Sequence, residues 1–480
     1  MGPFETTEAC SQWKKEYELP FEVIPDKDGT IFKRLTNGWV PYSILVGPDG
    51  KVIFWETEFQ EAGFVTAIEK FYQEPAETPA NTSQPSTRAK PPRVGRASGA
   101  NIVILGGGVG GLVAAHHLRR ALSRRDRVLL LDRSPNHLFQ SSLLWHAVGL
   151  RRTSQIQRSL SDLTRKGIEF INEEVLEIDV SSRHVRTTSQ MIEFDYLVVA
   201  LGAQLRPDEV EGFGEMALNL YDLEGTGRIH AALNAFSGGT VGVLVTDMPF
   251  KCPAAPYEAA LLVDSFLRKK GVRGRSEIHI YTPEHQPMPV AGPAMGEAIA
   301  GMLRTRDISY HPLFPFEKMN PREHTIVASG GEPQKVDLLL AVPPHRPPDV
   351  VRSSGLIGSS GWVETDPHTL ATEHEGVYAI GDVNNIRLAN GKNLPMAGVF
   401  AHSEAGIVAE RIAAEIDGRT SEASFDGKGS CWLELGGDKA GFASGNFYAE
   451  PEPTVHLYPA GRSWHWGKAL FERWWLHHWF

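Results

Sequence analysis

The chain has 480 residues and an apolar fraction of 41%, so it is long enough for several hydrophobic cores and more than one domain. Its net charge of −10 argues against nucleic acid as a main partner, because neutralising phosphates requires concentrated lysine and arginine. The sequence has no basic and apolar leader and no apolar run near the ~18 residues of a spanning helix, so we expect a cytoplasmic protein, soluble or peripherally bound.

The first 75 residues predict a small α/β segment. The letters PDG separate two β-rich runs, YSILV and KVIFWE, which predicts a hairpin. The stretch WVPYSILVGPDGKVIF resembles the C-terminal half of a thioredoxin-like domain of the peroxiredoxin type, with Pro41 at the position of the cis-proline. The CxxC of that family is absent from residues 1–75 and Cys10 has no nearby partner, so we expect a structural or docking segment.

A linker rich in Pro, Ser and Thr is predicted at residues 76–98. From residue 99 onward, strand and helix patterns alternate, which is typical of parallel α/β architecture.

A glycine-rich loop follows the first strand of this second part. In ANIVILGGGVGGLVAAHHLRRAL, Gly106, Gly108 and Gly111 form GxGxxG between a predicted strand and a predicted helix. The glycines permit a tight turn, close approach of a pyrophosphate and close helix packing, and the helix N-terminus faces the phosphates. Asp132 ends the next strand, where a carboxylate can bind a ribose hydroxyl. A dinucleotide site is therefore predicted, and the alternative is an ordinary tight turn.

Two later segments indicate FAD as the dinucleotide. FDYLVVALGA, with Ala200 and Gly202, resembles the strand and turn that carry ATG in flavoproteins with two dinucleotide domains. EGVYAIGDV places Gly381 and Asp382 after an apolar strand, and the resemblance implies that Asp382 binds the ribityl hydroxyls of FAD.

A second strand–turn–helix unit lacks the glycines. The strand GGTVGVLV leads into TDMPFKCPAAPYEAA, where a pyrophosphate would meet Met248, Pro249 and Phe250 instead of free amides, so bound NAD(P)H is not expected. Cys252 stands in the turn that approaches the flavin in such folds, and Lys251 and the helix N-terminus are expected to lower its pKa. The alternative is an inert buried cysteine.

Several segments from about residue 100 onward resemble the sulfide:quinone oxidoreductase and flavocytochrome c sulfide dehydrogenase family. They are MPFKCPAAPYEAALLVDSFLRKKGVR, HLFQSSLLWHAVGL and KNLPMAGVFAHSEAGIVAERI. The resemblance implies that FAD oxidises a sulfur donor with the help of two redox cysteines and passes electrons to a quinone or a cytochrome. Cys252 matches the first cysteine, and the second is expected near the GD turn, where none is found. Cys431 could be its partner only if the fold returns it, and we favour a structural role in a strand.

The family also has a lysine where this chain has Met396, and Lys392 is the candidate substitute near the flavin. His402 is a candidate for proton transfer to a quinone, although most such histidines only pack or cap.

The predicted fold is α/β, with two Rossmann-like dinucleotide-binding domains, of which the FAD-binding one is discontinuous, and a C-terminal subdomain. The predicted divisions after the linker are an FAD-binding domain in two parts, 99–237 and 341–420, a second Rossmann-like domain, 238–340, and a C-terminal subdomain, 421–480.

The last residues, SWHWGKALFERWWLHHWF, hold five of the eleven tryptophans. From Lys468 they predict a helix with a broad apolar face, and such aromatic density favours binding at a membrane interface. The alternatives are packing on the protein itself or on a second copy in a homo-oligomer.

We therefore expect an FAD-dependent oxidoreductase that passes electrons from sulfide or another small sulfur donor to a quinone, peripheral at the inner face of a membrane. One alternative is a type-II NADH:quinone reductase. The other is a non-catalytic flavin-containing redox partner or scaffold, with the thioredoxin-like segment as a dock. The three cysteines are too far apart for a zinc-ligand spacing, and no metal site is predicted.

Overall fold

The computed structural model describes residues 43–46, 52–56 and 99–480. The chain divides into two compact units, residues 1–90 and 91–480. In the first unit, β1 (Ser43–Val46) and β2 (Val52–Glu56) form an antiparallel pair whose register aligns the backbone of Leu45 with that of Phe54. The predicted pairing of these two runs is confirmed, whereas Pro41, Cys10 and the linker lie outside the described residues.

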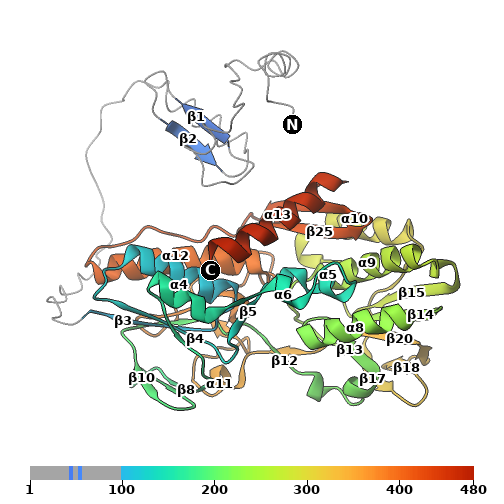
Figure 1. Ribbon diagram of the computed structural model, residues 1–480, viewed down its shortest axis with the longest axis horizontal. Coiled ribbons are helices and arrows are strands. Elements are labelled where there is room, and N and C mark those ends of the chain that lie inside the picture. Colours follow the sequence, from blue (N-terminus) through green and yellow to red (C-terminus); the bar gives the residue numbers. More distant parts are fainter. Residues whose placement is uncertain (1–42, 47–51, 57–98) are drawn as a thin grey trace. The chain divides into compact units, whose positions relative to one another are not determined.

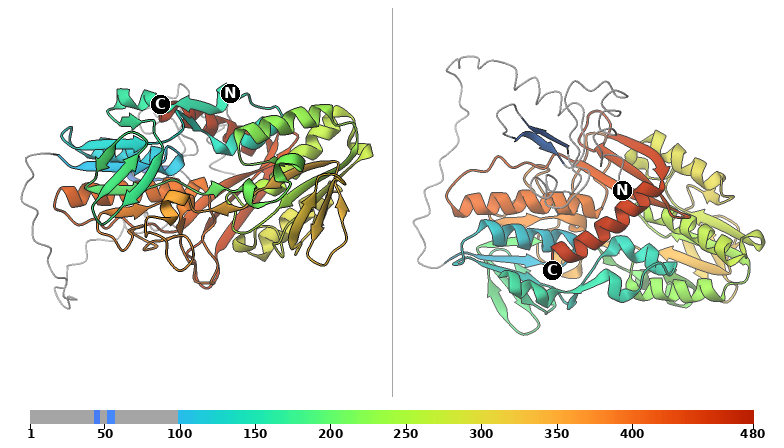
Figure 2. Two further views of the ribbon diagram at one scale, coloured as in Figure 1. Left: turned by 90° about the horizontal axis from the view of Figure 1, so that it is seen from below. Right: turned by 45° about the horizontal axis from the view of Figure 1, so that its top comes forward.

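The second unit contains two parallel five-stranded sheets, each covered on both faces (Figures 1 and 2). In the first sheet, helices α4 (Val109–Ala121) and α12 (Gly398–Ile416) pack on one face, and a three-stranded sheet packs on the other. One edge strand, β23, comes from far along the chain, so the domain is built from two separate segments. The strand order is β23 (Val377–Ala379), β11 (Tyr196–Val199), β3 (Asn101–Leu105), β4 (Arg127–Leu131) and β7 (Glu169–Ile171), and the covering strands are β8 (Val175–Asp179), β9 (His184–Thr187) and β10 (Met191–Glu193).

The second sheet repeats this arrangement. Helices α8 (Leu223–Ala235), α9 (Ala255–Lys270) and α10 (Pro293–Arg304) cover one face, and a small antiparallel sheet covers the other. The strand order is β13 (Ala217–Asn219), β20 (Leu338–Val342), β14 (Gly239–Val245), β15 (Ser276–Tyr281) and β16 (Ser309–His311), and the small sheet is β17 (Phe316–Asn320), β18 (Thr325–Ala328) and β19 (Gln334–Lys335).

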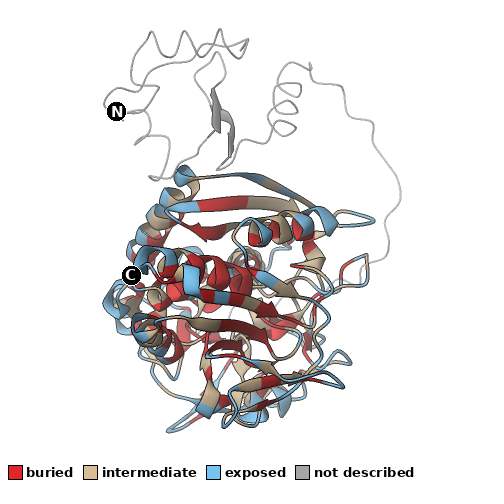
Figure 3. Ribbon diagram, turned by 90° about the vertical axis from the view of Figure 1, so that its right-hand side faces the viewer, coloured by how far each residue is buried: buried red, intermediate tan, exposed pale blue. Residues whose placement is uncertain are grey.

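The central strands of both sheets are continuous apolar runs that lie buried, while exposed residues gather on the outer helices and loops (Figure 3). Such runs suit strands that are covered on both faces. The chain passes between the two sheets through a short antiparallel pair, β12 (Gln204–Leu205) and β21 (His345–Arg346). The remaining short elements are β5 (Asn136–Leu138), β6 (Gln157–Ser159), α5 (Leu143–Ala147), α6 (Thr153–Ile156), α7 (Phe213–Met216), α11 (Asp349–Arg352), β22 (Val363–Glu364) and β24 (Asn384–Asn385).

The C-terminal part is a three-stranded antiparallel sheet followed by the predicted helix. The strands are β25 (Lys428–Gly436), β26 (Lys439–Asn446) and β27 (Thr454–Gly461), and the helix is α13 (Arg462–His478).

Part of the predicted apolar face of this helix packs on the protein itself, which was the alternative to membrane binding, and the membrane contact stays a prediction. Trp475 and Trp479 are only 2% and 3% exposed, because they pack into the core beside the first sheet. Trp466 and Leu470 remain exposed, at 64% and 59%. Among the described residues, no helix is both long and apolar enough to cross a membrane.

Candidate active site

A cavity of about 880 Å³ lies where strands of the first sheet end, next to the turn after β14. Its walls come from loops that follow the carboxyl ends of β3, β4, β11 and β23, the edge where open parallel sheets bind ligands. The structure brings these sequence-predicted residues together on its walls: Gly106, Gly108, Asp132, Ala200, Gly202, Lys251, Cys252, Gly381 and Asp382.

A side chain would clash with the protein backbone at two of the three predicted glycines and would project into open space at the third. A Cβ on Gly106 would lie 2.4 Å from the carbonyl oxygen of Ala200, and one on Gly111 would lie 1.9 Å from that of Gly106. Gly106 also has a φ of +102°, which a glycine adopts without strain. A Cβ on Gly108 would meet nothing within 4 Å. The loop is thus closed toward the protein and open at Gly108, which fits a phosphate ligand at the start of α4.

Asp132 is hydrogen-bonded to the glycine-rich loop. One carboxylate oxygen accepts the N–H of Gly107 at 2.6 Å, and the other accepts the N–H of Ser134 at 2.7 Å. Burial raises the pKa of this carboxyl group. Each oxygen keeps a second lone pair, so Asp132 can still accept a hydroxyl of a ligand in the cavity.

The Gly381–Asp382 turn is hydrogen-bonded to a buried glutamate that was not predicted from the sequence. Glu404 of α12 is 1% exposed and accepts the N–H of Gly381 at 2.6 Å and that of the Asn384 side chain at 3.2 Å. Burial raises the pKa of Glu404 to about 7. The sequence signal for a buried Glu404 is its spacing of four residues from Val408, which puts both on the buried face of α12.

Cys252 is held in an unusual backbone conformation. Its φ of +49° is left-handed, which is uncommon for a residue with a side chain. Its N–H donates to the carbonyl of Met396 at 2.6 Å, and its carbonyl accepts the hydroxyl of Tyr221 at 3.3 Å. The turn after β14 is therefore tied directly to the loop before α12.

The prediction of a lowered pKa for Cys252 is wrong. Burial, followed by the negative charge of Glu258, raises the pKa of the thiol well above its usual value. Lys251 attracts the Cys252 thiolate, but not enough to reverse this rise. Its side chain is 8% exposed, its pKa is lowered by burial, and the charge of Asp382 on the cavity wall acts against that lowering.

The fold brings β25, which carries Cys431, against α9, the helix that follows Cys252. The charge of Cys431 is among the causes that raise the pKa of Cys252. Although the Cys431 side chain keeps contact with solvent, the protein around it raises the pKa of its thiol to about 11 by desolvation. Both described thiols are free.

A buried ion pair joins α9, the helix that follows Cys252, to α13, and its carboxylate also contacts β25, which carries Cys431. Glu258 of α9 lines the cavity and accepts the N–H of Glu434 in β25 at 2.7 Å. The ammonium of Lys468 in α13 lies 3.5 Å from the same carboxylate and 4.9 Å from the ring centre of Trp145. Lys468 acts to lower the pKa of both thiols, whereas Glu258 raises them. The contact between Glu258 and Lys468 was not predicted, because the two residues lie far apart in the chain.

Three predicted residues do not reach the cavity walls: Gly111, which lies inside α4, Lys392 and His402. The ammonium of Lys392 donates to the carbonyl of Pro289 at 2.8 Å. His402 packs between Trp475 and Trp479, with ring centres 5.8 and 6.1 Å away, and burial lowers its pKa to about 4. Lys251 is instead the lysine at the cavity.

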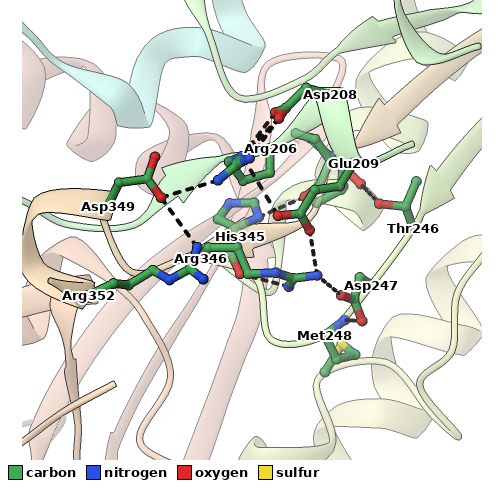
Figure 4. A network of polar contacts seen from close by, with 12 residues as sticks. Arg206, Asp208, Glu209, Thr246, Asp247, Met248, His345, Arg346, Asp349 and Arg352 are labelled. Carbon is green, nitrogen blue, oxygen red and sulfur yellow. Dashed lines mark hydrogen bonds and ion pairs between the residues drawn. The ribbon is translucent and has the colours of Figure 1, made fainter. Parts of the chain in front are cut away.

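The turn after β14 is occupied by the protein's own polar side chains (Figure 4). Arg346 of β21 lies 2.8 Å from carboxylate oxygens of both Asp247 and Glu209. Beside it, Arg206 pairs with Asp208 at 2.8 Å. The arginines near this turn are therefore already paired with carboxylates, whereas a dinucleotide phosphate would need free hydrogen-bond donors. Among the described residues, no group of three or more His, Cys, Asp and Glu side chains could hold a metal.

Residues 100–405 match the family model for pyridine nucleotide-disulphide oxidoreductases, so the chain belongs to this family. The family implies an oxidoreductase with a flavin cofactor. The mitochondrial sulfide:quinone oxidoreductase of Mus musculus is 26% identical over 74% of this chain and 79% of its own. The sulfide-quinone reductase of Aquifex aeolicus is 26% identical over 78% of this chain and 90% of its own.

The predicted fold class is confirmed by a solved structure. The X-ray structure of the sulfide:quinone oxidoreductase from Aquifex aeolicus superposes with a TM-score of 0.71 at 24% identity, over 78% of this chain and 90% of that one. A type II NADH:quinone oxidoreductase of Staphylococcus aureus is 22% identical over 67% of this chain and 84% of its own.

Proposed function

We propose that this protein is an FAD-dependent oxidoreductase that passes electrons from sulfide, or another small sulfur donor, through the flavin to a quinone. The observation that carries the proposal is one cavity lined by the glycine loop, the Gly381–Asp382 turn and Cys252. The relatives named for sulfide and quinone support the same donor and acceptor.

In this proposal the glycine loop binds the pyrophosphate of FAD, Asp132 a ribose hydroxyl and Asp382 the ribityl chain. When bound, the flavin supplies a two-electron acceptor. Lys251 provides positive charge at the cavity wall, in place of Lys392. The FAD-binding domain then comprises the two segments on either side of the second sheet, which runs from β13 to β20 and so begins before the predicted boundary at residue 237.

We further propose Cys252 and Cys431 as the working thiol pair. A disulfide between them would react with hydrosulfide: the S–S bond breaks, one sulfur becomes a persulfide and the other leaves as a thiolate. The ammonium of Lys468 favours that thiolate because it acts to lower the pKa of both cysteines. A positive group near the leaving sulfur lowers the barrier to disulfide opening.

The quinone requires contact with a lipid phase, and the outer side of α13 suits a peripheral contact. A groove of about 620 Å³ there is lined by the exposed Trp466 and Leu470 together with Arg151, Arg158 and Arg473. Tryptophan beside arginine is typical of segments that bind anionic membrane surfaces. We place the protein at the inner face of such a membrane, and a homo-oligomer remains a prediction.

Sequential mixing of the flavin-loaded protein with sulfide and with NADH tests the proposal, with the visible absorbance of the oxidised flavin as the signal. Sulfide is expected to bleach it, and Cys252→Ser and Cys431→Ser are each expected to prevent this. Bleaching by NADH alone would favour the type-II reductase, which the occupied turn at Asp247 and Arg346 opposes. No bleaching by either donor would favour the redox-partner or scaffold alternative.

A further inference from the structure

The C-terminal helix contacts the dinucleotide loop through one histidine. The indole N–H of Trp475 in α13 donates to Nε2 of His137 at 3.1 Å. On the other side of the same ring, Nδ1 of His137 lies 2.8 Å from the carbonyl oxygen of Gly107. His137 and Trp475 are 1% and 2% exposed, so water does not compete for these bonds.

The two partners fix the protonation state of His137. A carbonyl oxygen only accepts and an indole N–H only donates, so Nδ1 must carry the hydrogen and Nε2 must be bare. The ring is therefore neutral and held in one tautomer. Burial independently lowers the pKa of His137 to about 4, which gives the same neutral state at pH 7.

Gly107 is thereby held through both of its backbone polar groups. Its N–H donates to Asp132 and its carbonyl accepts from His137. Gly107 lies between Gly106 and Gly108 on the cavity wall, so its peptide plane sets the direction of the amide that follows it.

We propose that His137 and Trp475 are positioning residues of the dinucleotide site: the indole fixes the histidine tautomer, and the histidine fixes the Gly107 peptide that shapes the cradle for the FAD pyrophosphate. This inference rests on the proposed flavin site. It assigns the buried side of the C-terminal helix a role in cofactor retention, distinct from the outer side that we propose faces a membrane.

The helix has other attachments to the same segment, so loss of the indole bond alone leaves it in place. Glu472 accepts the Ser142 hydroxyl at 2.6 Å and pairs with Arg151 at 2.6 Å. The guanidinium of Arg158 donates to the carbonyl of Leu476 at 3.0 Å.

Trp475→Phe removes the N–H and keeps an aromatic ring. Trp479→Phe is its matched control, because Trp479, the C-cap residue of the same helix, is equally buried but its indole nitrogen has no hydrogen-bond partner among the described residues. We expect the dissociation constant for FAD, measured by fluorescence titration of apoprotein, to rise about five- to tenfold in Trp475→Phe, because the buried Nε2 of His137 loses its donor. In Trp479→Phe we expect this constant to rise less than about twofold.

A second pair of variants gives an independent readout. His137→Asn keeps a side-chain N–H where Nδ1 stood, whereas His137→Leu removes it, so the asparagine is expected to retain FAD more tightly than the leucine. Equal affinity in Trp475→Phe and Trp479→Phe, or in the two His137 variants, overturns the positioning role. Wild-type protein that binds no FAD would instead overturn the proposed function itself.

Discussion

The buried ion pair between Lys468 and Glu258 gives the sharpest test of how the C-terminal helix supports the thiol site. The two side chains are 6% and 3% exposed, with the ammonium 3.5 Å from the carboxylate. Lys468→Met leaves Glu258 buried and unpaired, which costs about 3–5 kcal/mol of unfolding free energy. Loss of the cation–π contact with Trp145 adds about 0.5–2 kcal/mol.

The assay is urea unfolding followed by tryptophan fluorescence, for both single variants and the double variant Glu258→Gln/Lys468→Met. The double variant removes both charges, so we expect it to recover at least about 2 kcal/mol relative to the sum of the single losses. Lys428→Met is the matched control, because its pair with Asp426 at 3.0 Å is solvent-exposed and should change stability by less than about 1 kcal/mol.

The same substitution has a chemical consequence at the cysteines. Burial alone would lower the pKa of Lys468, but Glu258, Glu434 and the two thiols raise it, so the ammonium stays charged. Removing that charge is expected to raise the pKa of Cys431 above about 11 and to slow its alkylation by iodoacetamide at a fixed pH. Additive stability losses, together with unchanged alkylation, would refute the reasoning.

Three further predictions follow from local geometry. Gly111→Ala puts a methyl group 1.9 Å from a loop carbonyl and should abolish FAD binding, whereas Gly406→Ala, with nothing within 4 Å, should leave it intact by the same titration. The pKa of Glu404 in the folded protein is raised to about 7, so ionisation of this carboxyl group disfavours folding. In urea titrations, the free energy of unfolding of wild type relative to Glu404→Gln should therefore fall by about 3 kcal/mol as the pH rises from 4.5 to 7. A difference that does not change with pH would contradict this prediction. Trp466→Ser should weaken sedimentation with anionic vesicles, and Leu313→Ser, which removes an equally exposed apolar side chain elsewhere, should not.

The dinucleotide loop could be predicted because its requirements are local. The GxGxxG spacing between an apolar strand and a helix predicts where the backbone must pass close to other backbone atoms. The structure shows such close approaches at Gly106 and Gly111. Lys251 and Cys252 were also found from one turn, although the pKa of Cys252 was misjudged because the charge of Glu258 and the extent of burial are tertiary properties.

The missed features depend on long-range contacts. The contact of Glu258 with Lys468 joins residues whose meeting depends on the packing of α9, β25 and α13 together. The tail was predicted to be helical, but its apolar face gave no sign of what would cover it. That cover comes from the segment around His137, which the tail sequence cannot reveal.

The position of α13 connects the two ends of the site. Lys468 contacts the carboxylate near the thiols, and Trp475 contacts the histidine behind the glycine loop. Seven residues separate them, or about 10 Å along a helix at 1.5 Å per residue. Because a helix is rigid over two turns, α13 relates the position of the Glu258 carboxylate to that of His137 behind the loop proposed to bind FAD. A change that shifts the helix along its axis is therefore expected to disturb the ion pair and the indole bond together.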